Sequence, residues 1–467
     1  MTMKILPKQV FVGGAAAATV LLATFVLVPN VLSDDDQPGR SGKMDDRRGR
    51  VGAEGLVDDN ARKMIEEGRR TFRFDTFGDQ VFWGDTIKLH QAIAGGKLGG
   101  VGAGVSPGTA LAVGLKVDLD ALPMPLRNNL ARGMVNLDDP ATTVALLKLN
   151  SVVGVTGYFN TSGQLQSMGV QCALCHSTVD DSFAPGIGRR LDGWANRDLN
   201  IGAIIALAPD LTVVTKLLGV DDSTVRTVLN SWGPGKFDAQ LFLDGKAFRP
   251  DGKSAATLIP PAFGLAGVNL GTSTGFGSTT YWNAFVANLE MHGRGTFYDP
   301  RLSNYTQFPV AAKAGSNDVR RDSNAPGDPD LITSKLAALH FYQLAIPAPK
   351  SAEAGGPSNV AAIRGEAVFN GRAQCSRCHV APLFTEPGFN MHTPQEIGID
   401  DFQANRSPTK MYRTAPPKGL MTHEKGGFYH DGRFPTLETV IDHYDNLLRT
   451  GLTNSEKSDL ISYLRSL

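Results

Sequence analysis

The four cysteines of the chain all lie in two copies of one short pattern, and each copy ends in a histidine. The two copies are Cys172-Ala-Leu-Cys175-His176 and Cys375-Ser-Arg-Cys378-His379. Two thiols three positions apart on a helical turn can each add to one vinyl group of a haem, and the imidazole that follows can ligate the iron from the same side. The pattern therefore predicts two covalently bound haem c groups, with His176 and His379 as proximal iron ligands.

Chance and other cysteine chemistry explain this repeat poorly. One such pattern is expected on the order of 0.001 times in a chain of this composition. A zinc site of four thiolates needs its cysteine pairs about 15–20 residues apart, whereas 199 residues lie between Cys175 and Cys375. A redox dithiol or a disulfide within one Cys-x-x-Cys is expected in a thioredoxin-like βαβ context, which neither flank has. Haem attachment also accounts for the two histidines.

The first 33 residues predict that the chain leaves the cytosol. Residues 10–32 carry no formal charge, and they follow Lys4 and Lys8 and precede Asp34. Their length suits a membrane-spanning helix better than a signal peptide, and the lysines favour a cytosolic N-terminus. An anchor and a cleaved signal peptide over residues 1–33 are both open, and both predict the periplasmic side of a bacterial inner membrane. The absence of a spare cysteine suits that compartment, because no wrong disulfide can form there.

Composition narrows the fold class and the partners. Lys plus Arg and Asp plus Glu number 46 each, so no net charge exists that would recruit nucleic acid. The 52 glycines and 27 prolines predict long irregular connections. We expect a mainly α protein with two cytochrome c-like haem domains and long loops. The expected partners are a redox partner protein or a small oxidant and the inner membrane, with no nucleic acid.

The sequence divides into five segments. After the anchor or signal peptide of residues 1–33, residues 34–57 are charged and poor in apolar side chains, which predicts a disordered tether. Residues 58–345 are predicted to form an elaborated N-terminal haem domain. A proline-rich linker over residues 346–359 then leads to a C-terminal cytochrome c domain over residues 360–467.

Apolar periodicity and capping residues predict several helices. Four of them cover residues 59–72, 281–292, 331–344 and 360–370. A last helix begins at a capping box made by Thr453 and Glu456. The glycine-rich stretch 95–108 contains no Gly-x-Gly-x-x-Gly after a strand, so a plain loop is favoured over a dinucleotide site.

The residues after the second haem motif resemble a known family. They include Phe384-Thr-Glu-Pro and Gly427-Phe-Tyr-His430-Asp431-Gly432-Arg-Phe-Pro-Thr-Leu437-Glu-Thr-Val-Ile-Asp-His-Tyr444-Asp. This pattern resembles the C-terminal domain of the bacterial di-haem cytochrome c peroxidase superfamily, and the resemblance covers about residues 171–467. The wide spacing of the two motifs and the stretch Arg190-Leu-Asp192-Gly193 are more similar to the haem-dependent rubber oxygenase branch than to the compact peroxidases.

The distal ligand of the second haem has competing candidates. On the helix that begins near Thr436, Tyr444 falls at the centre of the apolar face, while His443 points about 100° away. The superfamily places a methionine or tyrosine ligand here, so the resemblance implies iron ligation by Tyr444. A core tyrosine with its hydroxyl bonded elsewhere is the alternative. Met421 competes as a loop methionine before the last helix. His430 could line the haem pocket or brace its turn, and we expect the bracing role.

The distal side of the first haem stays open. His90, His292 and His340 are available, and each is more often a hydrogen-bonded structural histidine than an iron ligand. The resemblance implies a catalytic glutamate near this haem, but no stretch of the sequence matches its surroundings. The catalytic residues are therefore unassigned.

Two functions compete at this level. The leading hypothesis is an oxidoreductase in which one haem keeps an open or labile site for peroxide or dioxygen and the other relays electrons. The alternative is a non-catalytic electron-transfer cytochrome c, which the predicted anchor and tether favour. The long first region argues against this alternative, because a cytochrome that only carries electrons needs about 100 residues for each haem. A third class, a structural or zinc-stabilised binding protein, would carry no covalent haem.

Overall fold

Regular structure in this protein is mostly helical, and its strands occur only in pairs. The computed structural model describes residues 53–322, 327–351 and 359–467. The predicted anchor or signal peptide and residues 34–52 of the predicted tether lie outside the described residues. Within the described ranges, no helix combines the length and the apolar character needed to cross a membrane. The mainly α class predicted from the sequence is confirmed for this part of the chain.

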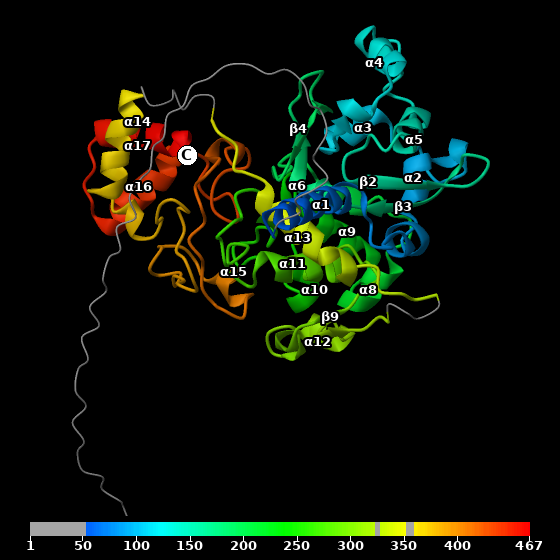
Figure 1. Ribbon diagram of the computed structural model, residues 1–467. Coiled ribbons are helices and arrows are strands. Elements are labelled where there is room, and N and C mark those ends of the chain that lie inside the picture. The colour runs from blue at the N-terminus through cyan, green and yellow to red at the C-terminus, as the bar shows by residue number, and fades with distance from the viewer. Residues whose placement is uncertain (1–52, 323–326, 352–358) are drawn as a thin grey trace, which may run out of the picture. The chain divides into compact units, whose positions relative to one another are not determined.

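From Ala53 to the first haem motif, the described residues form five α-helices and short helical turns. Its elements are α1 Ala53–Phe74, the π-helical η1 Val81–Thr86, α2 Leu89–Ala94, η2 Gly96–Leu98, α3 Pro107–Ala112, β1 Val117–Asp118, η3 Leu119–Ala121, α4 Met124–Ala131, α5 Pro140–Lys148, β2 Val155–Phe159 and β3 Leu165–Val170. Figure 1 shows α4 at the outer edge of this region. The stretch 95–108, predicted as a loop, contains η2 and the start of α3.

The region from the first motif to residue 345 alternates short helices with two-stranded pairs. Its elements are α6 Ala173–His176, β4 Ser177–Val179, β5 Ile187–Gly188, β6 Arg190–Asp192, α7 Ile201–Ile205, α8 Thr212–Leu218, α9 Asp222–Ser231, β7 Lys236–Phe237, α10 Leu241–Asp244, β8 Thr257–Leu258, α11 Thr279–Phe285, η4 Val286–Glu290, β9 Phe297–Tyr298, η5 Pro300–Ser303, α12 Pro309–Ala314, β10 Asp318–Val319, η6 Thr333–Lys335 and α13 Leu336–Ala345. The β1–β5 pair is parallel, and the pairs β2–β3, β4–β6, β7–β8 and β9–β10 are antiparallel.

The C-terminal region is built from fewer elements. They are α14 Val360–Asn370, η9 Cys375–Arg377, α15 Phe402–Asn405, η10 Leu420–Thr422, α16 Leu437–Leu448 and α17 Asn454–Ser466. The helix predicted over residues 360–370 is confirmed as α14. The capping box of Thr453 and Glu456 is also confirmed, because each side chain bonds the backbone N–H of the other residue at the start of α17.

Helix α1 crosses α13 where a glycine allows close approach. A Cβ placed on Gly68 would overlap with the carbonyl oxygen of Ala338, so only glycine fits at the crossing. One turn further along α1, the ring of Phe72 meets that of Tyr342 at a centroid distance of 5.7 Å in an edge-to-face contact. The crossing brings together two helices that lie more than 250 residues apart in the sequence, on either side of the first motif.

Helices α14 and α17 repeat this crossing around the second motif. A Cβ on Gly365 would overlap with the carbonyl oxygen of Asp459. The ring of Phe369, again four residues after the glycine, meets that of Tyr463 at 5.2 Å. The two halves of the chain therefore use the same glycine and aromatic pair to join the helices that flank each Cys-x-x-Cys-His pattern.

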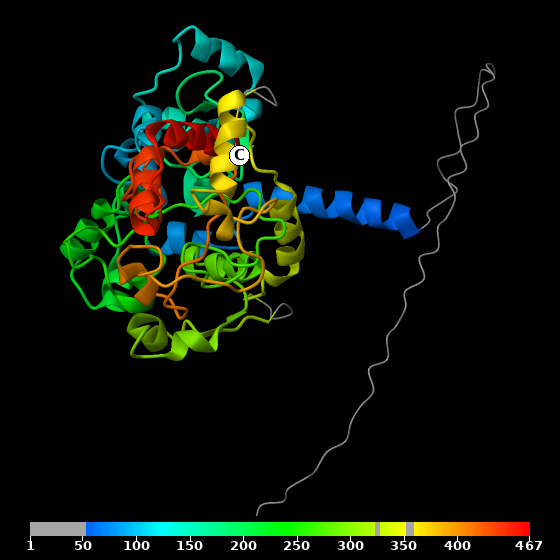
Figure 2. The ribbon, with the colours of Figure 1, turned by 90° about the vertical axis from the view of Figure 1, so that its left-hand side faces the viewer.

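The difference between the halves lies in what the chain inserts between the two crossing helices. The second motif begins five residues after α14 ends, whereas the segment from η1 to β3 separates α1 from the first motif. Figure 2 shows α1 along its length, with its N-terminal part extending away from the packed elements. Helix α1 begins at Ala53, so residues 53–57, which were expected in the tether, are helical. They prolong a helix whose later turns are packed, and each added residue gains one hydrogen bond.

Residues 53–467 form one compact unit. A buried ion cluster connects its two predicted domains: the guanidinium of Arg406 pairs with Asp238 at 3.0 Å and with Asp244 at 2.8 Å, and all three side chains are almost fully buried. The division into residues 58–345 and 360–467 with a linker at 346–359 stays a prediction, and residues 352–358 lie outside the described ranges.

Candidate haem sites

The first motif presents its histidine in the form that binds iron. Helix α6 ends at His176, and Nδ1 of that imidazole lies 3.1 Å from the carbonyl oxygen of Pro260, to which it donates. Burial lowers the pKa of His176 to about 4, against the opposing effect of that hydrogen bond, so the ring is neutral. Nε2 then keeps its lone pair for a metal, and a second-shell carbonyl orients the ring as in most histidine-ligated sites. The site fits a haem iron.

The second motif repeats this arrangement. Nδ1 of His379 lies 3.0 Å from the carbonyl oxygen of Phe384, which belongs to the Phe384-Thr-Glu-Pro stretch noted in the sequence. Burial lowers the pKa of His379, and the hydrogen bond to Phe384 opposes this effect. Both histidines therefore use Nδ1 as the donor and leave Nε2 for a ligand.

The four cysteines are free thiols in two separate places. Burial raises the pKa of Cys172 and of Cys175 to about 12 and that of Cys375 to about 11, so these thiols keep their protons in the folded chain. Zinc would require thiolates gathered at one point. Among the described residues, the one group of metal-binding side chains close enough to share an ion is Cys378, Glu386 and His392. The zinc-thiolate alternative therefore finds no four-cysteine site.

Tyr444 lies beside the second motif. Its pKa is raised by burial and by the charges of Cys378 and Cys375, which places the phenol near both thiols. The neighbouring His443 points elsewhere, because its Nε2 donates to the carbonyl oxygen of Ile397 at 2.8 Å. The structure thus brings Tyr444 to the cysteines of the second motif, while iron ligation by Tyr444 stays a prediction.

The other two candidates at the second site differ in position. Met421 lies on η10, whose Leu420 belongs to a small apolar cluster with Phe428 and Leu437. His430 is buried and its ring stacks on that of Tyr412, with centroids 5.2 Å apart. Its carbonyl oxygen accepts the N–H of Leu258 at 2.7 Å, so His430 holds its turn against β8.

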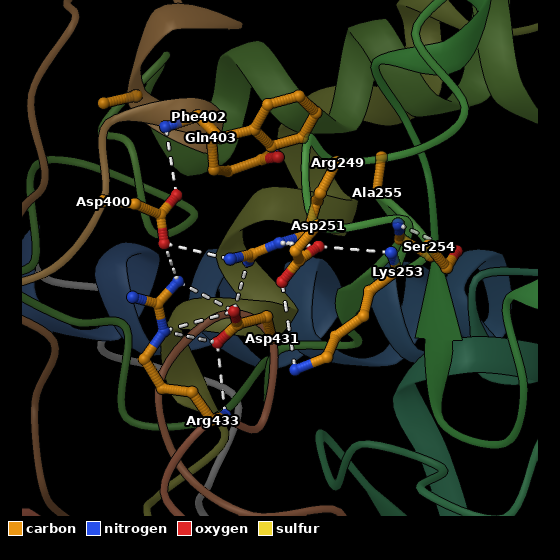
Figure 3. A network of polar contacts seen from close by, with 12 residues as sticks. Arg249, Asp251, Lys253, Ser254, Ala255, Asp400, Phe402, Gln403, Asp431 and Arg433 are labelled. Carbon is orange, nitrogen blue, oxygen red and sulfur yellow. Dashed lines mark hydrogen bonds and ion pairs between the residues drawn. The ribbon is translucent and has the colours of Figure 1, made fainter.

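Figure 3 shows how the turn that contains His430 is fastened to the first region. Arg249 extends between two carboxylates, Asp400 at 3.0 Å and Asp431 at 2.5 Å. Arg433 contacts the same two acids from the other side, at 2.5 and 2.8 Å. The His430-Asp431-Gly432-Arg433 stretch therefore has a structural function in this protein, because it forms a four-membered ion network across the two halves.

An acid lies beside the first motif that the sequence did not identify. Glu290 ends the π-helical turn η4, and its Oε1 is buried with no hydrogen-bond partner among the described residues. Burial raises the pKa of Glu290 to about 8, and the charge of Asp238 contributes. The charge of Glu290 in turn raises the pKa of the Cys175 thiol, so the carboxyl lies close to the first motif. π-Helical turns are frequent at functional sites.

The sequence offered one signal for Glu290, an isolated acid within the largely apolar run Phe285-Val-Ala-Asn-Leu-Glu290. Local structure then fixes its position. The indole N–H of Trp83 donates to the carbonyl oxygen of Met291 at 2.9 Å, directly after η4. The π-helical geometry, which changes where a side chain points, cannot be seen in the spacing of apolar residues.

The three candidate histidines for the first haem lie in different surroundings. The ring of His292 stacks on Phe82 with centroids 3.6 Å apart, two residues after Glu290. Nδ1 of His90 and Nδ1 of His340 are each buried without a hydrogen-bond partner among the described residues. His292 is thus the candidate that shares a segment with Glu290, and the distal ligand of the first haem remains unassigned.

An apolar cavity lies behind the first motif. Its volume is about 80 Å³, its exposed wall is entirely apolar, and Leu174 of the motif and Trp83 of η1 form part of it. A second apolar cavity of about 50 Å³ lies beneath α4. The two cavities share wall residues, namely Pro107, Leu111, Val117 and Leu146. They are therefore adjacent apolar spaces between the surface element α4 and the first motif.

Two curated proteins are similar to this chain. One is the methylamine utilization protein MauG of Methylorubrum extorquens, 24% identical over 271 residues, which are 49% of this chain and 76% of that protein. The other is the cytochrome-c peroxidase IdrP1 of Denitromonas iodatirespirans, 23% identical over 299 residues, which are 49% of this chain and 79% of that protein. No protein-family model matches the chain.

One solved structure with a related sequence is a hydrazine synthase from Kuenenia stuttgartiensis. It is 23% identical, the match covers 29% of this chain and 55% of that chain, and the TM-score is 0.21. At this TM-score the likeness carries no argument about the fold. The two curated relatives support the resemblance noted after the second motif.

Proposed function

We propose that this chain, a relative of the bacterial di-haem cytochrome c peroxidase superfamily, is a di-haem oxidoreductase that reduces peroxide or dioxygen at its first haem. The observation that carries the proposal is the contrast between the two motifs. Both present a neutral histidine with Nε2 free, but a buried unpartnered acid, Glu290, lies beside the first, and a phenol, Tyr444, lies beside the second. Two unlike pockets support two unlike haem functions.

When bound, the first haem would supply an open iron site for the oxidant and the second would supply electrons. Cys172 and Cys175 would hold the first haem by thioethers, and Cys375 and Cys378 would hold the second. His176, oriented by the carbonyl of Pro260, would fix the proximal side of the first site.

Glu290 would handle protons at the first site. Because its pKa is raised to about 8, the carboxyl carries a proton at neutral pH and can donate it to an oxygen of the oxidant. The unpartnered Oε1 is free for that contact. This assigns Glu290 the acid role that the family resemblance implied and that no stretch of the sequence had matched.

Tyr444 would close the second site. If its phenol bound the second haem, Tyr444 would exclude peroxide and dioxygen from that haem, and the second pocket would be suited to electron transfer. His443 is engaged by Ile397 and does not compete.

The apolar cavities favour dioxygen as a second candidate oxidant beside peroxide. A dry cavity lined by aliphatic side chains holds apolar molecules and excludes polar ones. Dioxygen is apolar and would enter such a space, whereas hydrogen peroxide would lose its hydrogen bonds to water. The layout with a long first region agrees with the oxygenase branch of the superfamily, which we retain as the proposed affiliation.

The proposed location is the periplasmic side of a bacterial inner membrane. The support is the charge-free run over residues 10–32, which lies outside the described residues, and the two haem c motifs, because bacteria attach haem c outside the inner membrane. The proposed partners are a redox protein that delivers electrons to the second haem and the membrane through the N-terminal segment.

The spin states of the two irons distinguish the proposed oxidoreductase from the alternative function, an electron-transfer cytochrome. Magnetic resonance of the oxidised full-length protein should show one high-spin and one low-spin haem, and peroxide should perturb only the high-spin signal. After reduction, carbon monoxide should change the absorption spectrum of that same haem only. A Cys172→Ala/Cys175→Ala variant should lose the perturbed signal and keep the other. Two low-spin irons that respond to neither ligand would exclude the enzyme and favour electron transfer.

A further inference from the structure

A buried cation without an anion lies next to the first motif. Arg197 is buried and exposes only 8% of its surface. Its Nε and Nη1 are buried and have no hydrogen-bond partner, and no carboxylate pairs with it among the described residues. Burial lowers the pKa of Arg197 to about 10, so the guanidinium remains charged at neutral pH.

A histidine from the C-terminal region lies beside this arginine. His423 follows η10, and its Nε2 is buried without a partner in the described part of the chain. Burial and the charge of Arg197 together lower the pKa of His423 to about 3. The imidazole is therefore neutral and can donate one N–H without adding charge.

The acids near this pair are already engaged. Asp198, the residue after Arg197, pairs with Lys116 at 2.6 Å and also with Lys425. Lys236, whose pKa is lowered by burial and in part by the charge of Arg197, donates to the carbonyl oxygen of Asp431 at 3.0 Å. Positive charge is thus in excess around Arg197, and a guanidinium buried without a counterion is strongly unfavourable.

A backbone hydrogen bond and a ring contact connect the surroundings of Arg197 and His423 to the first motif. The N–H of Asn196, the residue before Arg197, donates to the carbonyl oxygen of Cys175 at 2.9 Å. The ring of His423 lies 6.4 Å from that of Phe263, three residues after the Pro260 that orients His176. The unpartnered nitrogens therefore belong to the surroundings of the proximal histidine.

We propose that Arg197 and His423 together bind a propionate of the first haem. The proposal rests on the proposed function, since it requires a haem at Cys172 and Cys175. Haem c carries two carboxylates on the edge opposite its thioether-linked vinyl groups, and a guanidinium is the side chain best shaped to hold a carboxylate. The anion would supply the missing partners of Arg197 and of His423 at once.

This assignment gives the C-terminal region a part in the first haem site. Arg197 lies just after the first motif, whereas His423 belongs to a loop more than 200 residues later. A shared carboxylate would fasten that loop to the first haem. Arg197 and His423 are positioning residues here, and their removal should alter the first haem without touching the second.

The test compares Arg197→Gln with Arg197→Lys, His423→Leu and the control Arg372→Gln in the full-length haem protein. Arg372 is an exposed arginine that contacts Glu456. In Arg197→Gln the propionate bending bands of the first haem in the resonance Raman spectrum should shift. Loss of the positive charge should raise the ratio of ferric to ferrous first haem about tenfold at a fixed ambient potential, which corresponds to about 59 mV for a one-electron couple.

The other variants separate charge from shape. Arg197→Lys should restore most of the potential but not the propionate bands, because an ammonium keeps the charge without the fork geometry. His423→Leu should shift the bands with a smaller change in potential. The second haem should be unchanged throughout, and Arg372→Gln should match the wild type.

The result that would contradict this proposal differs from the result that would contradict the proposed function. If the wild type carries two covalent haems and Arg197→Gln leaves both the bands and the potential of the first haem as in Arg372→Gln, the propionate assignment is wrong. If Arg197→Gln loses the first haem altogether, the propionate bands and the potential are measured in Arg197→Lys instead. Unshifted propionate bands in Arg197→Lys would then contradict the assignment. A wild type without covalent haem at the first motif would instead overturn the function.

Discussion

The histidine of each Cys-x-x-Cys-His motif has one ring nitrogen in a hydrogen bond, and this leaves only the other nitrogen for a ligand. Nδ1 of His176 donates to Pro260 and Nδ1 of His379 donates to Phe384. A backbone acceptor fixes the tautomer and the ring orientation, so Nε2 is the only possible ligand atom in both rings. The differences between the two sites must therefore come from the other side chains beside each motif, chiefly Glu290 and Tyr444.

Replacing Tyr444 by Phe should alter the absorption and magnetic resonance spectra of the second haem only. The phenol oxygen is lost, while the ring that packs against Tyr429 is kept, so the covalent haem count should stay at two. His443→Gln is the matched control, because that ring faces Ile397 and its loss should leave the spectrum unchanged. An unaltered second haem in Tyr444→Phe would make Tyr444 a core residue.

Replacing Glu290 by Gln should lower kcat/KM for the oxidant by about 10²–10⁴-fold, the usual size of general acid catalysis. The wild-type rate should fall as the pH rises through about 8, because the carboxyl loses the proton that it donates. Glu290→Gln should lack this pH dependence. A carbon monoxide titration of the first haem serves as the control for an intact site, and an unchanged pH profile would contradict the acid role.

The pKa of Glu290 also affects how the stability of the protein changes with pH. The direction of this change is opposite to that caused by a salt-bridged acid. Its folded pKa is about 8 and its ordinary value is 4.5. The folded state therefore binds the proton more tightly, and stability falls as the pH rises from 4.5 to about 8. Burying this carboxyl lowers stability at neutral pH, as is usual for residues kept for function.

Among the elements, the helices were the most predictable part of the fold. Residues 360–370 were recovered as α14 because apolar periodicity and Asn359 at the N-cap agree. The helix predicted over residues 281–292 is instead α11 followed by η4, since π-helical geometry leaves no trace in the spacing of apolar residues. That difference is why the sequence indicated His292 as a candidate and missed Glu290.

The glycines at the two helix crossings were missed for a different reason. In a single helix, a glycine such as Gly68 or Gly365 only lowers helix propensity. Its use appears when the partner helix is in place, because the carbonyl oxygens of Ala338 and Asp459 occupy the space of a Cβ. Such long-range contacts are invisible to periodicity.

Replacing Gly365 by Ala should destabilise the protein by about 1–3 kcal/mol, the usual range for overpacking in a well-packed contact. Helix propensity alone would predict a gain of about 1 kcal/mol, so the sign of the change tests the crossing. Gly96→Ala is the control, because a Cβ there meets its nearest atom at 3.6 Å, an ordinary contact. Thermal unfolding measures both variants, and a stabilised Gly365→Ala would contradict the close approach of α14 and α17.

At the scale of the whole molecule, the sequence predicted two cytochrome c-like haem domains, and the described residues show how these two predicted halves are connected. Arg406 of the second half is buried between Asp238 and Asp244 of the first. Burial raises the pKa of Asp238 to about 6 even though Arg406 opposes this. Nothing in the local sequence marks these residues as partners, since they lie more than 160 positions apart. Ion pairs of this kind become visible only after folding.

The connection between the two halves can be tested at the ion network in Figure 3, which is less buried than the cluster around Arg406. Burial would raise the pKa of Asp431, but the hydrogen bond from Arg433 and the charges of His430, Arg433 and Arg249 lower it well below its ordinary range. Its contribution to stability is thus present above the unfolded pKa of about 3.8 and is lost as the pH falls through the folded value.

Replacing Arg249 by Gln should therefore lower the free energy of unfolding by about 1–3 kcal/mol at neutral pH, because two half-buried carboxylates lose a partner. Acid unfolding should begin at a higher pH than in the wild type, since the pKa of Asp431 rises when one cation is removed. Lys253→Gln is the control in the same loop: its side chain is 80% exposed and 3.9 Å from Asp251, so its loss should change stability by less than about 0.5 kcal/mol. Urea unfolding at pH 7 and pH 4 measures both, and an Arg249→Gln variant as stable as Lys253→Gln at both pH values would show that the network does not hold the two halves together.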